Sequence, residues 1–313
     1  MTLARASRIR PLVVAAVLAA ALALAECGTA NPGPVQTRAS PPARLAGGRP
    51  AHIAVIVMEN EEYGSIMGSH DAPYINSLAH DYGLAANMFA IAHPSLPNYL
   101  ALTGGSTFGI QSDCTGCSVG ESGLASQLSS ARISWKAYME NLPRSCFTGA
   151  SAGLYAKRHD PFVYYRDVVA DPALCSHVVP LTQLAADEQD NTLPTFVWIT
   201  PNVCHDMHEC DVATGDRFLS RLGPPLIHAL GPRGLLFLTW DEGSSDKGCC
   251  KLAAGGHIVT ILAGGAVRHH ARLETPTDHY SVLQTVEDLL GLPRLRGAAC
   301  NCTPTLAPLL AER

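Results

Sequence analysis

The stretch His52-Ile53-Ala54-Val55-Ile56-Val57-Met58, which runs directly into Glu59-Asn60, decides the fold class. Its continuous apolar and largely β-branched run predicts a strand that is buried on both faces, as in the parallel sheets of α/β proteins. Further apolar runs predict additional strands at residues 195–200, 235–239 and 257–262, and an amphipathic run predicts a helix at residues 279–290. We therefore predict an α/β fold in which helices flank a central, mostly parallel sheet.

The first 25 residues have the composition of a secretory signal peptide. Arg5, Arg8 and Arg10 precede an apolar run at residues 12–25 that is too short to span a bilayer comfortably. Ala23-Leu24-Ala25 offers a small-x-small cleavage site. We predict a secreted or extracytoplasmic protein, with a retained membrane anchor as the alternative.

The segment after the signal peptide predicts a tether. Residues 24–27 resemble a lipoprotein box in which Glu26 replaces the usual small residue, so lipid attachment at Cys27 is an open alternative that would anchor the protein to the cell surface. Residues 26–50 are rich in Pro, Gly and Ala, a composition typical of a flexible tether. We predict one domain over residues 51–313, with residues 109–190 as an insertion over the sheet edge.

Charge and cysteine content limit the classes of partner. Removal of residues 1–25 takes away three arginines and leaves 19 basic against 27 acidic residues, a net charge of −8. A chain of this sign lacks the electrostatic footprint of a nucleic-acid-binding protein. Setting Cys27 aside leaves ten cysteines, an even number that is consistent with disulfides in an exported protein. A disulfide between Cys204 and Cys210 would stiffen the loop that they bracket. We expect a monomer.

Polar clusters follow three of the predicted strands. They are Glu59-Asn60, then Asn202 with His205-Asp206-x-His208, and Asp241-Glu242. Each cluster alone is typical of a solvated loop, but ligands of α/β sheets bind beyond the carboxyl ends of the strands, where three such clusters can converge. Carboxylate and amide oxygens favour hard cations, and imidazoles favour zinc or iron. The clusters therefore predict a site for a divalent metal ion (Mg, Ca, Zn, Mn or Fe).

The segment Ala92-His93-Pro94-Ser95-Leu96-Pro97-Asn98-Tyr99 predicts a reactive serine. Two prolines hold Ser95 extended just outside a predicted helix, where free amides and the helix dipole favour a phosphate or another oxyanion. A metal ion beside Ser95 would lower the pKa of its hydroxyl, and nearby histidines could protonate a leaving group. The alternative is that Ser95 merely caps the helix.

Six segments together resemble one protein family. They are residues 57–60, residues 72–78 (Ala-Pro-Tyr-Ile-Asn-Ser-Leu), residues 93–101, residues 201–208, Thr239-Trp240-Asp241-Glu242-Gly243, and residues 279–283. In order, and over about residues 52–293, they resemble the phosphoesterase family that joins bacterial acid phosphatases and phospholipases C within the alkaline phosphatase superfamily. The resemblance implies an alkaline-phosphatase-like three-layer sandwich that forms a phosphoesterase catalytic domain.

The resemblance also implies a role for individual residues. It implies Ser95 as the nucleophile that becomes phosphorylated, with His205 and His208 as further catalytic residues. The implied metal ligands are Glu59, Asn60, Ser95, Asp206, Asp241 and Glu242, and the implied substrate contacts are Asn98, His257 and His279. Two-metal relatives hold their second ion with an Asp-x-x-x-His pair, and because Cys204 occupies the Asp position here, a single-metal site is implied.

The resemblance implies a phosphatase that acts on phosphate monoesters, with phosphoinositides among the candidates and a phosphorylated small molecule or lipid headgroup as its partner. A phospholipase C-type phosphodiesterase is the first alternative, because the aromatic residues 162–165 would suit a larger apolar mouth. A non-catalytic solute-binding lipoprotein is the second alternative. Of the remaining histidines, His159 and five others show no partner pattern and are expected at the surface or in ordinary packing.

Overall fold

The computed structural model describes residues 42–45 and 48–311. The predicted signal peptide, the predicted lipid-attachment residue Cys27 and most of the predicted tether lie outside these residues. Within the described part of the chain, no helix combines the length and the apolar character needed to cross a membrane.

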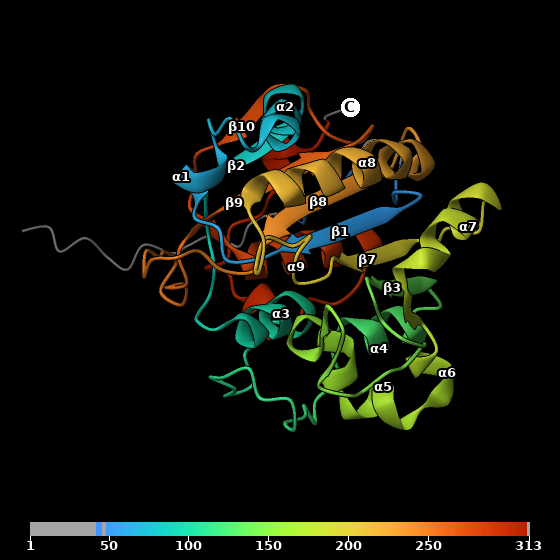
Figure 1. The fold of residues 1–313 in the computed structure, drawn as a ribbon. Helices are drawn as coiled ribbons and strands as arrows, with labels where there is room; N and C mark the ends of the chain where they lie inside the picture. The colour runs from blue at the N-terminus through green and yellow to red at the C-terminus, as the bar shows by residue number, and fades with distance from the viewer. Residues whose placement is uncertain (1–41, 46–47, 312–313) are drawn as a thin grey trace, which may run out of the picture. The chain divides into compact units, whose positions relative to one another are not determined.

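Nine strands of the described chain form one sheet, in the order β10-β2-β9-β8-β1-β7-β3-β6, with β11 paired to β2 (Figure 1). Every strand pair is parallel except the two that β9 makes, with β2 and with β8. The strands are β1 (Ile53–Met58), β2 (Gly83–Phe89), β3 (Trp135–Met139), β6 (Val178–Pro180), β7 (Phe196–Thr200), β8 (Leu235–Trp240), β9 (His257–Ala263), β10 (Ala271–Leu273) and β11 (Thr277–Asp278). The expected mostly parallel α/β sheet is confirmed.

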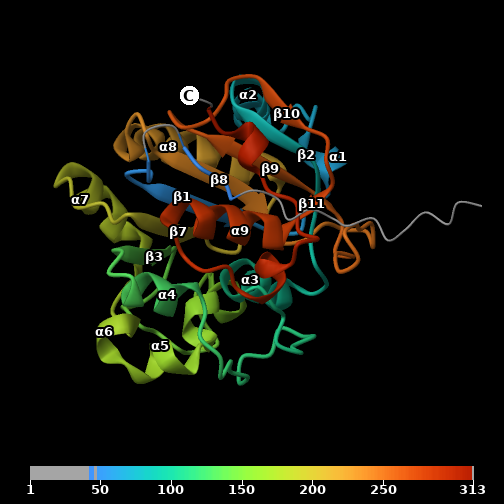
Figure 2. The ribbon, with the colours of Figure 1, turned by 180° about the vertical axis from the view of Figure 1, so that it is seen from behind.

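Helices cover both faces of this sheet. α2 and α8 lie over one face, and α9 and α3 lie over the other (Figures 1 and 2). The helices are α1 (Tyr63–Ile66), α2 (Pro73–Asp81), α3 (Ser95–Gly104), α4 (Leu124–Ser130), α5 (Arg166–Ala170), α6 (Pro172–Cys175), α7 (Leu184–Gln189), α8 (Val212–Leu230) and α9 (His279–Leu290). Short elements complete the fold: β4 (Ser151–Ala152), β5 (Tyr155–Ala156), and the 3₁₀ turns η1 (Lys157–His159), η2 (Pro161–Tyr164), η3 (Leu181–Gln183), η4 (Arg296–Ala299) and η5 (Ala307–Leu309).

Strand β1 lies at the centre of the sheet. All six of its residues are buried, as the apolar run predicts, and it pairs with β8 on one side and with β7 on the other. In register, Met58 lies opposite Trp240, the last residue of β8. The residues that follow, Glu59 and Asp241, therefore emerge side by side at the carboxyl edge of the sheet.

The segment at residues 109–190 is more than the predicted insertion over the sheet edge. It supplies β3 and β6, which extend the sheet beyond β7. Residues 162–165, three of which are aromatic, are all buried, and the Phe162 ring packs against Trp135 and Trp198. Since these side chains belong to the core, they form no exposed apolar mouth.

Part of the predicted tether packs on the domain. Ala43 and Leu45 are buried, and the Ala43 amide donates a hydrogen bond of 2.8 Å to the Asp288 carboxylate. The structured domain thus reaches into the stretch for which the composition predicts flexibility.

The expected disulfides are present among the described residues. All ten described cysteines pair, as Cys114–Cys117, Cys146–Cys175, Cys204–Cys210, Cys249–Cys250 and Cys300–Cys302. This includes the Cys204–Cys210 pair that the sequence analysis suggested as a stiffener of the loop after β7.

Helix α9 carries a buried carboxyl that makes the stability of the fold depend on pH. Burial raises the pKa of Glu287 to about 8, although the Leu295 amide donates a hydrogen bond to its Oε1 atom. Because the folded-state pKa lies above the unfolded one, the stability contributed by Glu287 is complete at about pH 4 and is lost as pH rises toward 8. Relative to wild type, we expect Glu287→Gln to gain up to about 1.4 kcal/mol per pH unit across this window.

Chemical denaturation at pH 5 and pH 8 measures this effect. Exposed Glu121→Gln is the matched control and should show no such gain. An equal difference between Glu287→Gln and wild type at both pH values would contradict the assignment.

Candidate active site

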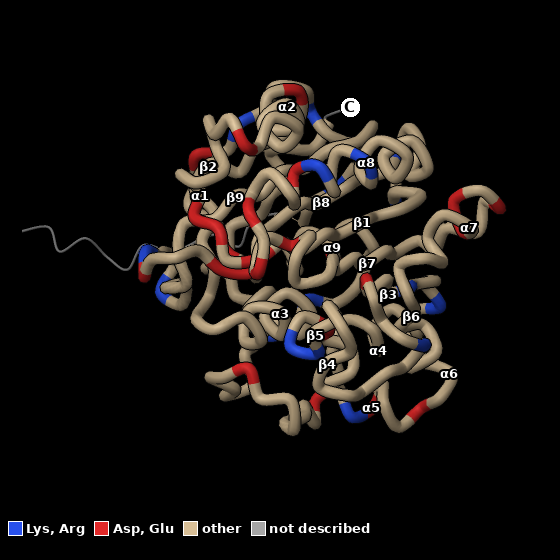
Figure 3. The backbone as a smooth tube through the Cα atoms, viewed as in Figure 1, with Lys and Arg blue, Asp and Glu red and all other residues tan. Residues whose placement is uncertain are grey.

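Four carboxylates gather at the carboxyl edge of the sheet. Glu59 follows β1, Asp241 and Glu242 follow β8, and Asp206 lies in the loop after β7. Three of them are completely buried and Glu242 is nearly so. Backbone hydrogen bonds join the strand ends, with the Glu59 amide donating to the Asp206 carbonyl (2.9 Å) and the Asp241 amide to the Met58 carbonyl (2.8 Å). Figure 3 shows acidic residues concentrated along this edge.

Ser95 points its hydroxyl into this carboxylate cluster. Its Oγ lies 3.0 Å from Glu59 Oε2 and 3.3 Å from Glu242 Oε1. The sequence places Ser95 just outside a helix, but in the structure it is the first residue of α3, and Pro94 is the N-cap. Pro94 itself makes no side-chain capping hydrogen bond, and the Ser95 hydroxyl bonds carboxylates instead of backbone amides. The alternative of a serine that merely caps its helix is therefore not what the structure shows.

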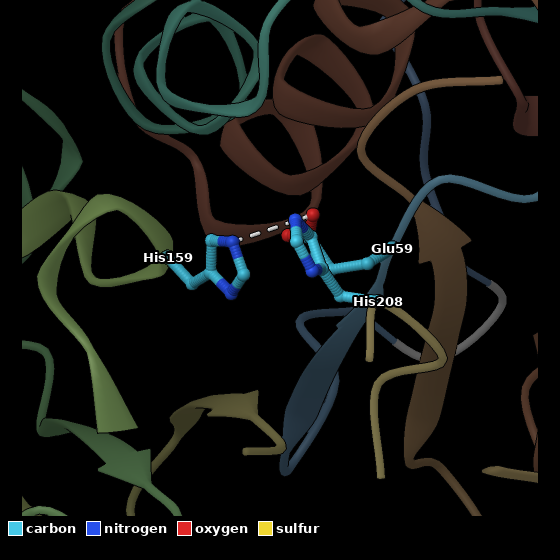
Figure 4. Close-up of side chains that lie close together, drawn as sticks. All are labelled: Glu59, His159 and His208. Atoms are coloured by element: carbon cyan, nitrogen blue, oxygen red, sulfur yellow. Dashed lines mark ion pairs between the residues drawn. The ribbon is translucent and has the colours of Figure 1, made fainter. Parts of the chain in front are cut away.

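Two residues that the sequence analysis missed also contact Glu59. Tyr99, one turn after Ser95 on α3, donates a hydrogen bond of 2.5 Å to Glu59 Oε1. His159, on η1, lies with Nε2 at 3.4 Å from Glu59 Oε2 (Figure 4). Its Nδ1 lies 3.1 Å from Asp206 Oδ2. His159 is only 2% exposed and contacts two carboxylates of the cluster, so the prediction of a surface or ordinary packing residue is wrong. Nothing in the local sequence signals this role, because the partners Glu59 and Asp206 are both remote from His159 in the chain.

Burial and mutual repulsion shape the charges of the cluster. Burial raises the pKa of Glu59 and of Asp206 well above the ordinary range, and it raises the pKa of Asp241 to about 7 with a further contribution from Glu242. Burial also lowers the pKa of His159 well below its ordinary value, and the charge of Arg158 adds to this shift. The cluster contains more negative charge than its hydrogen-bond donors can balance.

The residues present fit a bound cation. Asp241 Oδ2 is buried and has no hydrogen-bond partner among the described residues, which leaves a carboxylate oxygen available as a ligand. Glu59, His159 and His208 also each offer a ligand atom within 4.8 Å of the others. Carboxylate oxygens suit hard divalent ions, and imidazole nitrogens widen the choice toward zinc and iron.

The loop after β7 is built around side-chain to backbone hydrogen bonds. Asn202 Oδ1 accepts from the amides of Cys204 (3.0 Å) and His205 (2.9 Å), and Asp206 Oδ1 accepts from the amide of His208 (2.8 Å). The Cys204–Cys210 disulfide closes the same loop. These bonds hold the Asp206 carboxylate next to the His159 ring.

The two histidines of this loop have different surroundings. The His208 ring lies 5.6 Å from the His159 ring, and because Arg158 Nη2 can only donate, His208 Nε2 accepts its hydrogen bond at 3.2 Å. His205 instead bonds Glu140 through Nδ1 at 2.9 Å and stacks on Phe218 of α8. The structure thus brings His208 to the carboxylate cluster, and it gives His205 contacts outside it.

Two of the predicted substrate contacts, Asn98 and His257, use their side chains to bond backbone groups of the chain. The Asn98 side chain makes hydrogen bonds to the loop that precedes Ser95. Its Oδ1 accepts from the amides of Ile91 and Ala92, and its Nδ2 donates to the Ala92 carbonyl. His257 bonds the Ala86 carbonyl and stacks on Tyr63.

Two other histidines contact residues at or directly after the end of β8. Buried His279 bonds the Trp240 carbonyl beside Asp241, and burial lowers its pKa to about 4. His93, which was not among the predicted site residues, contacts Glu242 through Nδ1. The amide of Asn60 donates to Asp241 Oδ1 at 3.1 Å.

Comparison with known proteins identifies the family. The model of the phosphoesterase family matches residues 67–293. The chain belongs to this family. Over 256 residues it is 38% identical to a phosphatidylinositol-3-phosphatase of Mycobacterium tuberculosis, covering 81% of each chain. It is 28% identical to a phosphate-repressible acid phosphatase of Penicillium chrysogenum over 76% of this chain and 59% of that protein. The chain is thus a hydrolase of phosphoric esters.

Solved structures confirm the expected fold. An alkaline phosphatase superfamily protein from Vibrio parahaemolyticus superimposes with a TM-score of 0.58 at 14% identity, over 84% of this chain and 73% of that one. The lipoteichoic acid synthase LtaP of Listeria monocytogenes gives a TM-score of 0.59 at 11% identity, over 83% and 77%. At these identities the likeness concerns the fold alone, and the fold is that of the alkaline phosphatase superfamily.

Proposed function

We propose that this phosphoesterase is an exported, metal-dependent phosphatase that hydrolyses phosphate monoesters through a phosphoserine at Ser95. The observation that carries the proposal is the Ser95 hydroxyl, which starts α3 and bonds Glu59 Oε2 and Glu242 Oε1 within a buried carboxylate cluster. A serine held in this way is available as a nucleophile, and the helix N-terminus beside it favours an anionic substrate.

The reaction proceeds in two displacements at phosphorus. Ser95 Oγ forms a bond to phosphorus while the bond to the substrate alcohol breaks, and the alcohol leaves with a proton. Water then attacks the phosphoserine and releases inorganic phosphate and the free hydroxyl. Glu59 Oε2 and Glu242 Oε1 orient the serine hydroxyl and are the acceptors within reach of its proton.

A divalent ion would be held by Glu59, Asn60, Asp241 and Glu242 together with Ser95. When bound, the ion would act as a Lewis acid that offsets negative charge on the substrate and on the serine oxygen. Asp206 stays a proposed ligand as well, because its Oδ2, like Asp241 Oδ2, is buried with no hydrogen-bond partner among the described residues. His159 lies beside it, with Nδ1 3.1 Å from Asp206 Oδ2.

The substrate class is proposed from the family relationship. The mycobacterial relative is named as a phosphatidylinositol-3-phosphatase, and phosphoinositide headgroups are therefore candidate substrates here as well. The phosphodiesterase alternative loses its structural argument, because residues 162–165 are core residues. The five disulfides suit an oxidising compartment, which supports export, and anchoring through Cys27 remains part of the proposal.

Removal of the nucleophile tests the reaction. We expect Ser95→Ala to lower the release of phosphate from an aryl phosphate by about a thousandfold or more, because no other described hydroxyl lies between Glu59 and Glu242. Ser77→Ala, on the exposed surface of α2, should behave like wild type. Acid quenching of wild type followed by mass spectrometry should locate a phosphate on Ser95. Equal rates for Ser95→Ala and wild type would refute the mechanism.

Metal binding can be measured through thermal stability, without any catalytic activity. Saturation of a site at 100 times its dissociation constant stabilises a fold by about 2.7 kcal/mol. We therefore expect chelation with EDTA to lower the Tm of wild type by several degrees, and Mn²⁺ to restore it. Asp241→Asn should abolish most of this response, because it removes a carboxylate oxygen that has no other partner.

Exposed Asp71→Asn is the matched control and should respond to the metal as wild type does. A wild-type Tm that stays the same with EDTA and with Mn²⁺ would contradict metal dependence.

A further inference from the structure

Asp113 bonds the first turn of the helix that carries Ser95. Its Oδ1 accepts a hydrogen bond of 3.0 Å from the amide of Leu96, the residue directly after the serine. Its Oδ2 lies 3.7 Å from Nε of Arg158. A helix N-terminal amide and a guanidinium are the two kinds of group that proteins commonly use to bind phosphoryl oxygens. Here a carboxylate of the chain itself occupies the position between them.

The loop that carries Asp113 is held in place on both sides. The Cys114–Cys117 disulfide closes a tight turn immediately after Asp113, and Lys157 Nζ donates a hydrogen bond of 2.7 Å to the Thr115 carbonyl within this turn. Lys157 and Arg158 are consecutive residues of η1. The contact that docks the loop therefore also sets Asp113 against Arg158.

Arg158 faces the carboxylate cluster as well as Asp113. Its Nη2 donates to His208 Nε2, and the next residue, His159, contacts Glu59. The side chains of Arg158 and Asp113 are 26% and 32% exposed, so both remain accessible to solvent. Asp113 is close enough to Glu242 to add to the rise that burial causes in the pKa of that carboxyl.

We propose that Asp113 is a substrate-mimicking carboxylate, which occupies the place of a phosphoryl oxygen between the Leu96 amide and Arg158 and is displaced when a phosphate group binds. Arg158 then becomes a phosphate-binding residue of the site. The inference rests on the proposed phosphatase function, and it adds a residue that competes with the substrate for the Leu96 amide and Arg158.

The difference in charge between a carboxylate and a phosphate dianion favours displacement of Asp113 by the phosphate. Asp113 contributes one negative charge and two oxygens, whereas a phosphate monoester dianion contributes two charges and three terminal oxygens to the same donors. The dianion can therefore displace the carboxylate. The exchange costs affinity, because the Leu96 amide and Arg158 must give up the contacts that Asp113 already makes.

Binding of inorganic phosphate to the metal-loaded protein measures this cost directly. By isothermal titration calorimetry we expect Asp113→Ala to bind phosphate about tenfold more tightly than wild type, and Arg158→Ala to bind it about tenfold more weakly. Asp113→Asn keeps an acceptor for the Leu96 amide but loses the charge, so its affinity should lie between those of Asp113→Ala and wild type. With an aryl phosphate, Asp113→Ala should show a lower KM.

Asp246→Asn is the matched control. Asp246 lies 3.8 Å from His93, and its side chain is 96% exposed, but the α3 amide bonds Asp113 and not Asp246. We expect its affinity for phosphate to stay within about twofold of wild type, as is usual for an exposed charge.

The outcomes separate the inference from the function on which it rests. Phosphate binding by Asp113→Ala that is unchanged or weaker, in a wild type that hydrolyses the aryl phosphate, overturns the inference alone. A wild type that neither binds nor releases phosphate overturns the proposed function itself. The unfolding profile of Asp113→Asn, which preserves the side-chain shape, shows whether any loss arises from misfolding of the loop.

Discussion

The structure depends on one electrostatic constraint, the convergence of Glu59, Asp206, Asp241 and Glu242 at the carboxyl edge of the sheet. Four buried carboxylates repel one another, and desolvation disfavours the charge of each. They stay together because β1, β7 and β8 are parallel neighbours with buried side chains, so apolar packing of the sheet offsets the repulsion at its edge. A bound divalent cation relieves the same repulsion, and in our proposal this is why the nucleophile lies there.

The first turns of α3 meet several needs of the site with closely spaced residues. Ser95 presents the hydroxyl, and Tyr99 donates to the Glu59 carboxylate that the hydroxyl also contacts. Asn98 bonds the backbone of the preceding loop and so fixes where the helix begins. The preceding His93 contacts Glu242. Within one continuous sequence motif, Ser95 thus presents the nucleophile, Asn98 holds the preceding loop, and Tyr99 and His93 contact the carboxylates.

Much of the fold could be predicted because its signals are local. Long apolar runs marked β1, β7, β8 and β9, and the polar residues directly after three of these strands marked the edge where the site lies. His159 and Tyr99 could not be found in this way, because their partner Glu59 is remote in sequence and their own neighbours show no metal-binding pattern. His205 shows the converse: the family resemblance implied a catalytic role, but the turn directs its side chain to Glu140 and Phe218. Which side of a loop a residue faces depends on tertiary packing that local sequence does not contain.

The central claim is that the buried carboxylates form a single cation site on which Ser95 lies. The most direct test is X-ray diffraction at the manganese absorption edge from crystals of the mature protein grown with Mn²⁺. The account predicts one strong anomalous peak, coordinated by Glu59, Asp241 and Glu242 and adjacent to Ser95 Oγ. A peak elsewhere, or none between these carboxylates at a metal concentration that supports turnover, would contradict it.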